Sequence, residues 1–231
     1  MAVTGVLFDF SGTLFRAEPA DDWLRAVVHA AGADVPPDAL KRWARRLSAA
    51  GAQPGVAPPG GVPPHLAAAW AVRDRSAAEH RAAYTALARE VELPDPGWYP
   101  ALYDRHMAPE AWHPYPDAEE VLVGLQARGV AVGVVSNIGW DLRPVFAARG
   151  WDRFVDAYAL SYEHGVQKPD ARLFRVACAA LGREPGELLM VGDDRRADGG
   201  AAALGCSVHF VDHLPVAQRP DSLRPVLDLA V

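Results

Sequence analysis

Five short apolar runs recur along the chain, and each has the length of a buried β-strand. Runs that are apolar at nearly every position are typical of strands buried on both faces of a parallel sheet. Helical patterns separate the last four runs, which predicts strand–helix–strand units with right-handed crossovers. The predicted strands are residues 3–8, 130–135, 155–160, 188–191 and 208–211.

Two of the helical patterns have clear ends. Apolar residues share one face of residues 117–128, and Gly129 follows them, as glycine commonly does after a helix. Residues 170–181 repeat this pattern and end at Gly182. The sequence therefore predicts an α/β fold, a Rossmann-like three-layer sandwich with a parallel sheet, whose ligands bind at the carboxyl ends of the strands.

About a hundred residues separate the first two predicted strands, far more than a crossover connection requires. Helical spacing of apolar residues within them predicts a helical cap over residues 16–113, inserted into a core of residues 1–15 and 114–231. Residues 52–64, AQPGVAPPGGVPP, are too rich in Pro and Gly for regular structure and are expected to form a loop. The cap helices are predicted at residues 21–31, 37–50, 66–73, 76–90 and 98–107.

Composition narrows the class of protein further. The 231 residues are 50% hydrophobic, enough to bury one or two cores without disulfides, and the two cysteines, Cys178 and Cys206, form no metal-binding or disulfide pattern. A net charge of −6 without a basic run argues against nucleic acid or anionic membranes as partners. With neither a leader pattern nor an apolar run of roughly 20 residues, a soluble, cytoplasmic protein is expected.

Polar residues with possible chemistry follow the first two strands. Asp9 ends the first strand, and Gly12 lets the next turn curl its amides around an anion. Ser136, in VVSN, ends the second strand and could hold a phosphoryl oxygen at the same edge of the sheet. Each feature alone is equally consistent with a side chain that only caps a turn.

Two further groups complete a possible phosphoryl site. Lys168, in QKP, could neutralise an anionic nucleophile and a phosphoryl group together as a point charge. Asp193 follows a glycine at the end of the fourth strand, and Asp198 lies five positions later. Carboxylates so placed suit Mg²⁺, with Asp193 as the better ligand and Asp198 as a second or outer one. An acidic turn that caps a helix is the structural alternative for Asp198.

The stretches FDFSGTLF, VVSN, QKP and VGDDRRAD resemble, in order and at the expected strand ends, the four motifs of the haloacid dehalogenase-like hydrolase superfamily. The resemblance implies that Asp9 attacks phosphorus to form an aspartyl phosphate. It also implies that Asp9, the carbonyl of Ser11 and Asp193 hold magnesium, while Ser136 and Lys168 position the phosphoryl group. Within or beside these motifs, the further candidates for substrate contacts are Ser11, Gly12, Thr13, Asn137 and Arg16.

Ser11 departs from the family pattern, because family phosphatases usually carry a second aspartate two residues after the nucleophile. A hydroxyl cannot replace that general acid and base near neutral pH, and losing the role typically costs about 10²- to 10⁴-fold in rate. Hydrolysis should be slow unless another base acts, from the cap or from a residue such as Asp141.

Three functions are consistent with these features. We favour a Mg²⁺-dependent phosphatase or phosphotransferase acting on a small phosphorylated metabolite. An L-2-haloacid dehalogenase, which needs no metal and also lacks the second aspartate, is the alternative, although the acidic residues around Asp193 would repel its carboxylate substrate. The third is a non-catalytic binding domain on the same fold.

Overall fold

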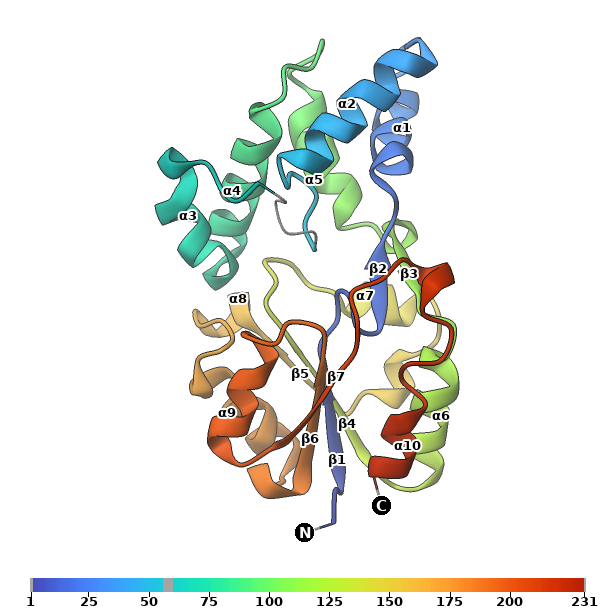
Figure 1. Ribbon diagram of the computed structural model, residues 1–231, viewed down its shortest axis with the longest axis vertical. Coiled ribbons are helices and arrows are strands. Elements are labelled where there is room, and N and C mark those ends of the chain that lie inside the picture. Colours follow the sequence, from blue (N-terminus) through green and yellow to red (C-terminus); the bar gives the residue numbers. More distant parts are fainter. Residues whose placement is uncertain (1, 56–59, 231) are drawn as a thin grey trace.

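The centre of the protein is a parallel five-stranded sheet with the strand order β5-β4-β1-β6-β7 (Figure 1). The computed structural model describes residues 2–55 and 60–230. All five predicted strands are confirmed, with ends shifted by one or two residues where the pattern gave no sharp boundary. The strands are β1 (Gly5–Phe8), β4 (Ala131–Ser136), β5 (Ala157–Leu160), β6 (Leu188–Gly192) and β7 (Ser207–Phe210).

Helices cover both faces of this sheet, which confirms the predicted three-layer fold. In Figure 1, α9 (Ala171–Leu181) lies on one face, and α6 (Ala118–Ala127) and α10 (Pro225–Leu229) lie on the other. Successive side chains of a strand point to opposite faces. Accordingly, Val6 and Phe8 of β1 belong to the hydrophobic cluster beneath α6, whereas Leu7 belongs to the cluster beneath α9.

A separate group of helices, here called the helical bundle, lies above the carboxyl ends of the strands (Figure 1). It has its own hydrophobic cluster, built on Trp23, Leu24 and Leu47. Its third helix starts later than predicted, because Pro64–Leu66 forms a 3₁₀ turn. Of the predicted loop 52–64, residues 56–59 lie outside the described residues. The bundle helices are α1 (Ala20–Ala30), α2 (Pro37–Ala49), α3 (Ala67–Val72), α4 (Ala77–Arg89) and α5 (Trp98–His106).

Two short strands that the sequence did not predict join the bundle to the sheet domain. β2 (Phe15–Ala17) pairs antiparallel with β3 (Trp112–Pro114), so that Arg16 lies opposite His113. Three residues are too few for an alternating pattern to be recognised. Across residues 2–55 and 60–230, no helix combines the length and apolar character that crossing a membrane demands.

Candidate active site

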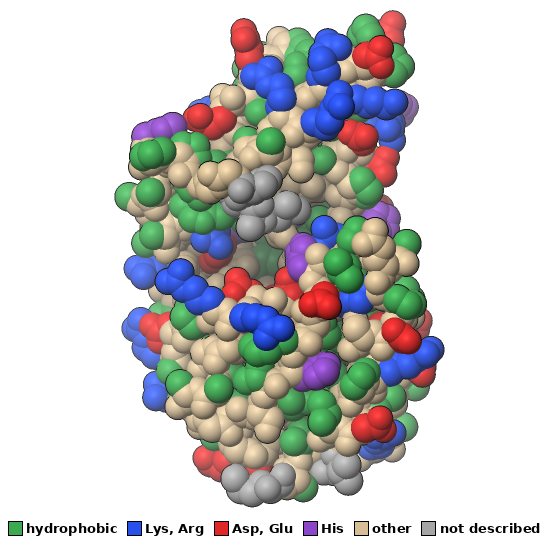
Figure 2. All heavy atoms as spheres, in the orientation of Figure 1, with side chains coloured by type: hydrophobic (Ala, Val, Ile, Leu, Met, Phe, Trp, Pro, Cys, Tyr) green, Lys and Arg blue, Asp and Glu red, His purple; other side chains and the backbone are tan. Residues whose placement is uncertain are grey.

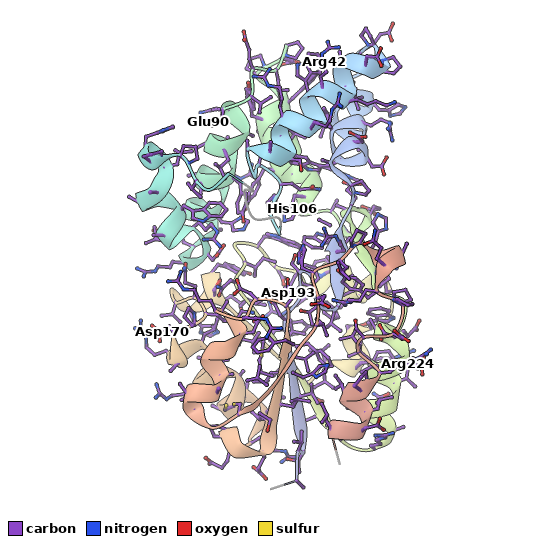
Figure 3. All side chains as sticks on the ribbon, in the orientation of Figure 1. Arg42, Glu90, His106, Asp170, Asp193 and Arg224 are labelled. Atoms are coloured by element: carbon purple, nitrogen blue, oxygen red, sulfur yellow. The ribbon has the colours of Figure 1, made fainter. Side chains whose placement is uncertain are left out.

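Three strand ends meet beneath the helical bundle. β1 lies between β4 and β6, and its register with both places Asp9, Ser136 and Asp193 at one edge of the sheet. The amide of Asp9 donates a hydrogen bond to Val191 O at 2.9 Å, which continues the pairing of β1 with β6. Figure 3 shows Asp193 in the space between the sheet and the bundle. The predicted convergence of the strand ends is therefore present.

Lys168 joins two of the predicted carboxylates. Its Nζ lies 2.9 Å from Asp9 Oδ1 and 2.6 Å from Asp198 Oδ1, and all three side chains are buried. The other oxygen of Asp198 accepts the amide of Asp194 at 2.9 Å, so both oxygens of this carboxylate are engaged. Asp198 therefore holds Lys168 in place, which fits an outer role better than direct metal ligation.

Asn137 fixes the backbone at Lys168. Its Oδ1 accepts the Lys168 amide at 2.6 Å, and its Nδ2 donates to the Lys168 carbonyl at 3.0 Å. The side chain of Asn137 thus positions the lysine turn, in addition to lining the cavity described below. Ser136, the last residue of β4, is buried next to it.

Burial and neighbouring charges shift the pKa values of this cluster. Burial, together with the charges of Asp198 and Asp193, raises the pKa of Asp9 to about 7 even though the nearby Lys168 opposes the shift. Burial also raises the pKa of Asp198. The two carboxylates raise the pKa of Lys168 and outweigh its desolvation. The ammonium group is therefore a permanent cation beside a carboxylate that is costly to ionise without more positive charge.

Asp193 completes an arrangement able to bind a cation. One oxygen each of Asp9, Asp193 and Asp198 lies within 4.8 Å of the others. Asp193 Oδ1 accepts the Thr13 hydroxyl at 3.4 Å, and its Oδ2 lies 2.5 Å from His213 Nδ1. His213 follows the last strand and was not predicted, because a single histidine carries no spacing signal.

The loop after Asp9 leaves one of its carbonyls without a hydrogen bond from the described residues. Gly12 has a φ of +81°, and a Cβ there would collide with His213 and Asp193, so glycine is required. Hydrogen bonds occupy the carbonyls of Phe10, Gly12 and Thr13. Among the described residues, none donates a hydrogen bond to the carbonyl oxygen of Ser11. This is the oxygen that the family resemblance assigns to the metal.

A cavity of about 500 Å³ lies over these groups, between the sheet and the helical bundle. Figure 2 shows a hollow there, with acidic side chains and a histidine at its rim. Arg16, a candidate for substrate contact, lines the cavity, and its Nη1 is buried without a hydrogen-bond partner among the described residues. The bundle contributes residues to this cavity that the sequence did not identify: Gly55, Trp70, Arg73, Asp74 and Tyr84.

The contribution of the bundle is centred on Arg73. Its guanidinium stacks 3.9 Å from the centroid of the Trp70 ring, donates to Trp70 O at 2.9 Å and pairs with Asp74 at 3.2 Å. The carbonyl of Asp74 accepts the Ser161 hydroxyl at 2.6 Å, which attaches this part of the bundle to the sheet domain. Burial raises the pKa of the Asp74 carboxyl.

Asp141, considered above as an alternative base, is not among the residues that line the cavity. Its carboxylate pairs instead with Arg143 at 3.0 Å, and about half of its side chain is exposed (49%). An exposed, ion-paired carboxylate outside the cavity is a poor candidate for a base, so the structure argues against that interpretation.

Comparison with known proteins places these features in a family. The sequence model described as "haloacid dehalogenase-like hydrolase" matches residues 3–205. A phosphoserine phosphatase of Thermus thermophilus is 36% identical over 119 residues, which cover 51% of this chain and 47% of that protein. A (S)-2-haloacid dehalogenase 4A of Burkholderia cepacia is 36% identical over 93 residues, 39% of this chain and 40% of the relative. The chain thus matches about half or less of the length of these two curated relatives.

The fold also resembles solved structures. The structure of L-2-haloacid dehalogenase from Xanthobacter autotrophicus matches with a TM-score of 0.64 and 23% sequence identity, covering 97% of this chain and 82% of the other. At that level of identity the likeness concerns the fold. The relatives therefore include both a phosphatase and dehalogenases, and the choice between these chemistries depends on the site itself.

Proposed function

This chain belongs to the haloacid dehalogenase-like hydrolases and is an enzyme, and from that premise we propose that it is a Mg²⁺-dependent phosphatase or phosphotransferase for a small phosphorylated metabolite. Asp9 is the nucleophile in this proposal, and the helical bundle acts as a cap over residues 16–113 on a core of residues 1–15 and 114–231. A cytoplasmic location belongs to the same proposal. Membership in a hydrolase family leaves the non-catalytic alternative without support.

One observation carries the choice of a phosphatase over a dehalogenase. One oxygen each of Asp9, Asp193 and Asp198 lies within 4.8 Å of the others, beside the ammonium group of Lys168, so with Asp9 ionised the formal charges of these four groups add to −2. Such a cluster attracts a divalent cation and repels a carboxylate substrate. A haloacid would have to bring its own carboxylate to this edge, whereas a phosphate ester can share a cation with it.

The residues present fit Mg²⁺. Carboxylate and carbonyl oxygens are its preferred protein ligands, and the carbonyl of Ser11 has no competing hydrogen bond from the described residues. Asp9, Asp193 and the Ser11 carbonyl would hold the ion, with Asp198 behind Lys168. When bound, Mg²⁺ would neutralise the negative charge that a nucleophilic carboxylate and a phosphoryl group bring together.

The steps of the proposed reaction use the side chains of Asp9, Lys168 and Ser136. Asp9 forms an oxygen–phosphorus bond while the bond from phosphorus to the leaving oxygen breaks, which gives an aspartyl phosphate and an alkoxide that takes a proton from water to become the alcohol. Lys168 favours the ionised form of Asp9 and orients it, and the hydroxyl of Ser136 would hold a phosphoryl oxygen. Water then attacks the intermediate, which releases phosphate and restores Asp9; an acceptor alcohol in place of water makes the reaction a phosphotransfer.

Ser11 sets the expected rate of the second half of this reaction. Its hydroxyl cannot take a proton from the attacking water near pH 7. The aspartyl phosphate is therefore expected to accumulate, and its breakdown to limit turnover.

The proposal is tested by a screen of small phosphate esters, including phosphoserine, with and without Mg²⁺. Wild type and Asp9→Asn are compared, and the protein is assayed for a hydroxylamine-sensitive phosphate label. We expect Mg²⁺-dependent release of phosphate and a label in wild type, and neither in Asp9→Asn. Turnover that survives this substitution would rule out Asp9 as the nucleophile.

The dehalogenase remains the second candidate, because the stretch FDFSGTLF and the Burkholderia relative favour it. In that reaction Asp9 would displace halide from carbon and form an ester. Halide release from L-2-chloropropionate in the presence of a metal chelator would support it over the phosphatase.

A further inference from the structure

The segment that follows β7 crosses back to the nucleophile loop and lies outside the matched family region, residues 3–205. It is held at both ends: Leu214 O accepts the Tyr115 hydroxyl at 2.7 Å, and the Leu223 amide donates to Asp117 Oδ2 at 2.6 Å. Two side chains of the segment reach the site. His213 contacts Asp193, and Arg219 contacts the loop that follows Asp9.

Arg219 is an unusual buried cation, with only 3% of its surface exposed. Its Nη1 donates to Gly12 O at 2.5 Å and to Asp212 O at 3.2 Å, and its Nη2 donates to Thr13 O. Its Cζ lies 3.1 Å from the centroid of the Tyr115 ring. Within the described ranges, no carboxylate forms a salt bridge with it. Burial lowers the pKa of this guanidinium below its usual range.

Burying a charged guanidinium costs free energy, which its contacts with carbonyl oxygens and an aromatic face partly offset. Arg219 occupies the carbonyls of Gly12 and Thr13, and the turn itself occupies that of Phe10, whose oxygen accepts the amides of Leu14 and Phe15. Only the intervening carbonyl, that of Ser11, is left free of hydrogen bonds from described residues. The guanidinium thus fixes two successive peptide planes directly after the one that carries the free oxygen.

We propose that Arg219 is a positioning residue for the cation site, which orients the Ser11 carbonyl toward the cation by holding the next two carbonyls away from it. The inference rests on the proposed function, because it assumes that Ser11 O is a ligand. It extends the functional site to the segment beyond the matched family region. His213, on the same segment, holds the other ligand side chain, Asp193.

The test measures Mg²⁺ binding to the full-length protein by calorimetry, without substrate. We expect Arg219→Gln to weaken Mg²⁺ binding by about 10- to 100-fold, the range found when groups that orient metal ligands are removed. Arg219→Lys should weaken it as well, because one ammonium cannot span two carbonyls as a planar fork does. Arg224→Gln, an exposed arginine paired with Glu120, is the matched control and should bind as wild type does.

If Arg219 had only a structural role, its substitution would lower the free energy of unfolding without weakening Mg²⁺ binding in the folded protein. Thermal unfolding is therefore measured for each variant, and Arg219→Lys carries the test if the glutamine variant does not fold. Added guanidinium ion, far below denaturing concentrations, should restore part of the Mg²⁺ affinity of Arg219→Ala. Folded variants that bind Mg²⁺ as tightly as wild type would overturn this inference alone. A wild-type protein that binds no Mg²⁺ would overturn the proposed function and the inference with it.

Discussion

The Nζ of Lys168 lies 2.9 Å from Oδ1 of Asp9. Among the described residues, no other cation forms a salt bridge with Asp9, and the only other carboxylate paired with Lys168 is that of Asp198. The position of Lys168 affects the protonation of Asp9. Burial and two nearby carboxylates favour the neutral acid, and Lys168 opposes them. In the proposed reaction, the buried ammonium group therefore favours the ionised form of Asp9 that acts as the nucleophile.

Replacing that ammonium should disable the enzyme. In Lys168→Met the side chain keeps its length and loses its charge, so the pKa of Asp9 should rise further and the carboxylate become scarce. We expect turnover to fall by about 10²- to 10³-fold, as when one preorganised charged donor is removed. Steady-state release of phosphate measures the effect. Arg172→Met, an exposed arginine near the start of α9, is the control, and equal activities of the two variants would contradict the role of Lys168.

Introducing an aspartate at position 11 should speed the second half-reaction. Ser11→Asp supplies the acid and base that the family pattern usually provides, and we expect the phosphoenzyme to decay about 10²- to 10⁴-fold faster. Rapid quenching of labelled protein measures that decay. Ser11→Asn, of nearly the same size but without an ionisable group, should leave the decay slow. If both variants decayed alike, space at this position rather than proton transfer would limit the reaction.

The sheet and its strand-end residues could be predicted because they follow from local patterns. Continuous apolar runs mark buried strands, and parallel strands must present their carboxyl ends at one edge, so Asp9, Ser136 and Asp193 could be brought together without coordinates. The contribution of the helical bundle could not be predicted. Arg73 begins a 3₁₀ turn directly after α3, and Tyr84 lies on α4. From the sequence such a residue is expected to face solvent, and only tertiary packing turns it toward the cavity.

For the same reason, the two site residues in the segment that follows β7 could not be predicted. His213 and Arg219 stand in a stretch with no periodicity. Arg219 bonds to a loop some two hundred positions earlier in the sequence, and His213 contacts Asp193, which lies 20 positions before it. Arginine is mostly exposed in folded proteins, yet Arg219 is buried against backbone carbonyls. Contacts of this kind depend on how the chain returns over the sheet, which no local pattern encodes.

Removing the metal should abolish activity reversibly. We expect a chelator to stop phosphate release and Mg²⁺ to restore it, since the carboxylate cluster otherwise repels an anionic substrate. Asp193→Asn should weaken Mg²⁺ binding at least about tenfold, because it removes a charged ligand. Calorimetry provides the measurement, and Asp221→Asn, an exposed carboxylate on the C-terminal segment, is the control. Full activity in chelator would exclude a metal-dependent reaction.

Acidification should destabilise the protein through a histidine buried in the helical bundle. The Nδ1 of His80 lies 2.6 Å from the Tyr103 hydroxyl, and only 2% of the residue is exposed. Burial, helped by the charge of Arg73, lowers its pKa to about 3 from an ordinary value of 6.5. Between these two values the unfolded chain binds a proton that the folded chain does not. The free energy of unfolding therefore falls as the pH is lowered through this window, by at most about 1.4 kcal/mol per pH unit from this group.

Substituting the histidine should flatten that dependence. In His80→Asn the amide can still meet the Tyr103 hydroxyl but cannot take up a proton, so urea unfolding between about pH 5 and 7 should show a shallower slope than in wild type. His106, which is also buried with a lowered pKa, contributes a slope of the same sign, whereas Asp9, whose pKa is raised, contributes one of the opposite sign. His164→Asn changes an exposed histidine and should leave the slope as it is. A His80→Asn variant with the full wild-type slope would show that another group titrates in this range.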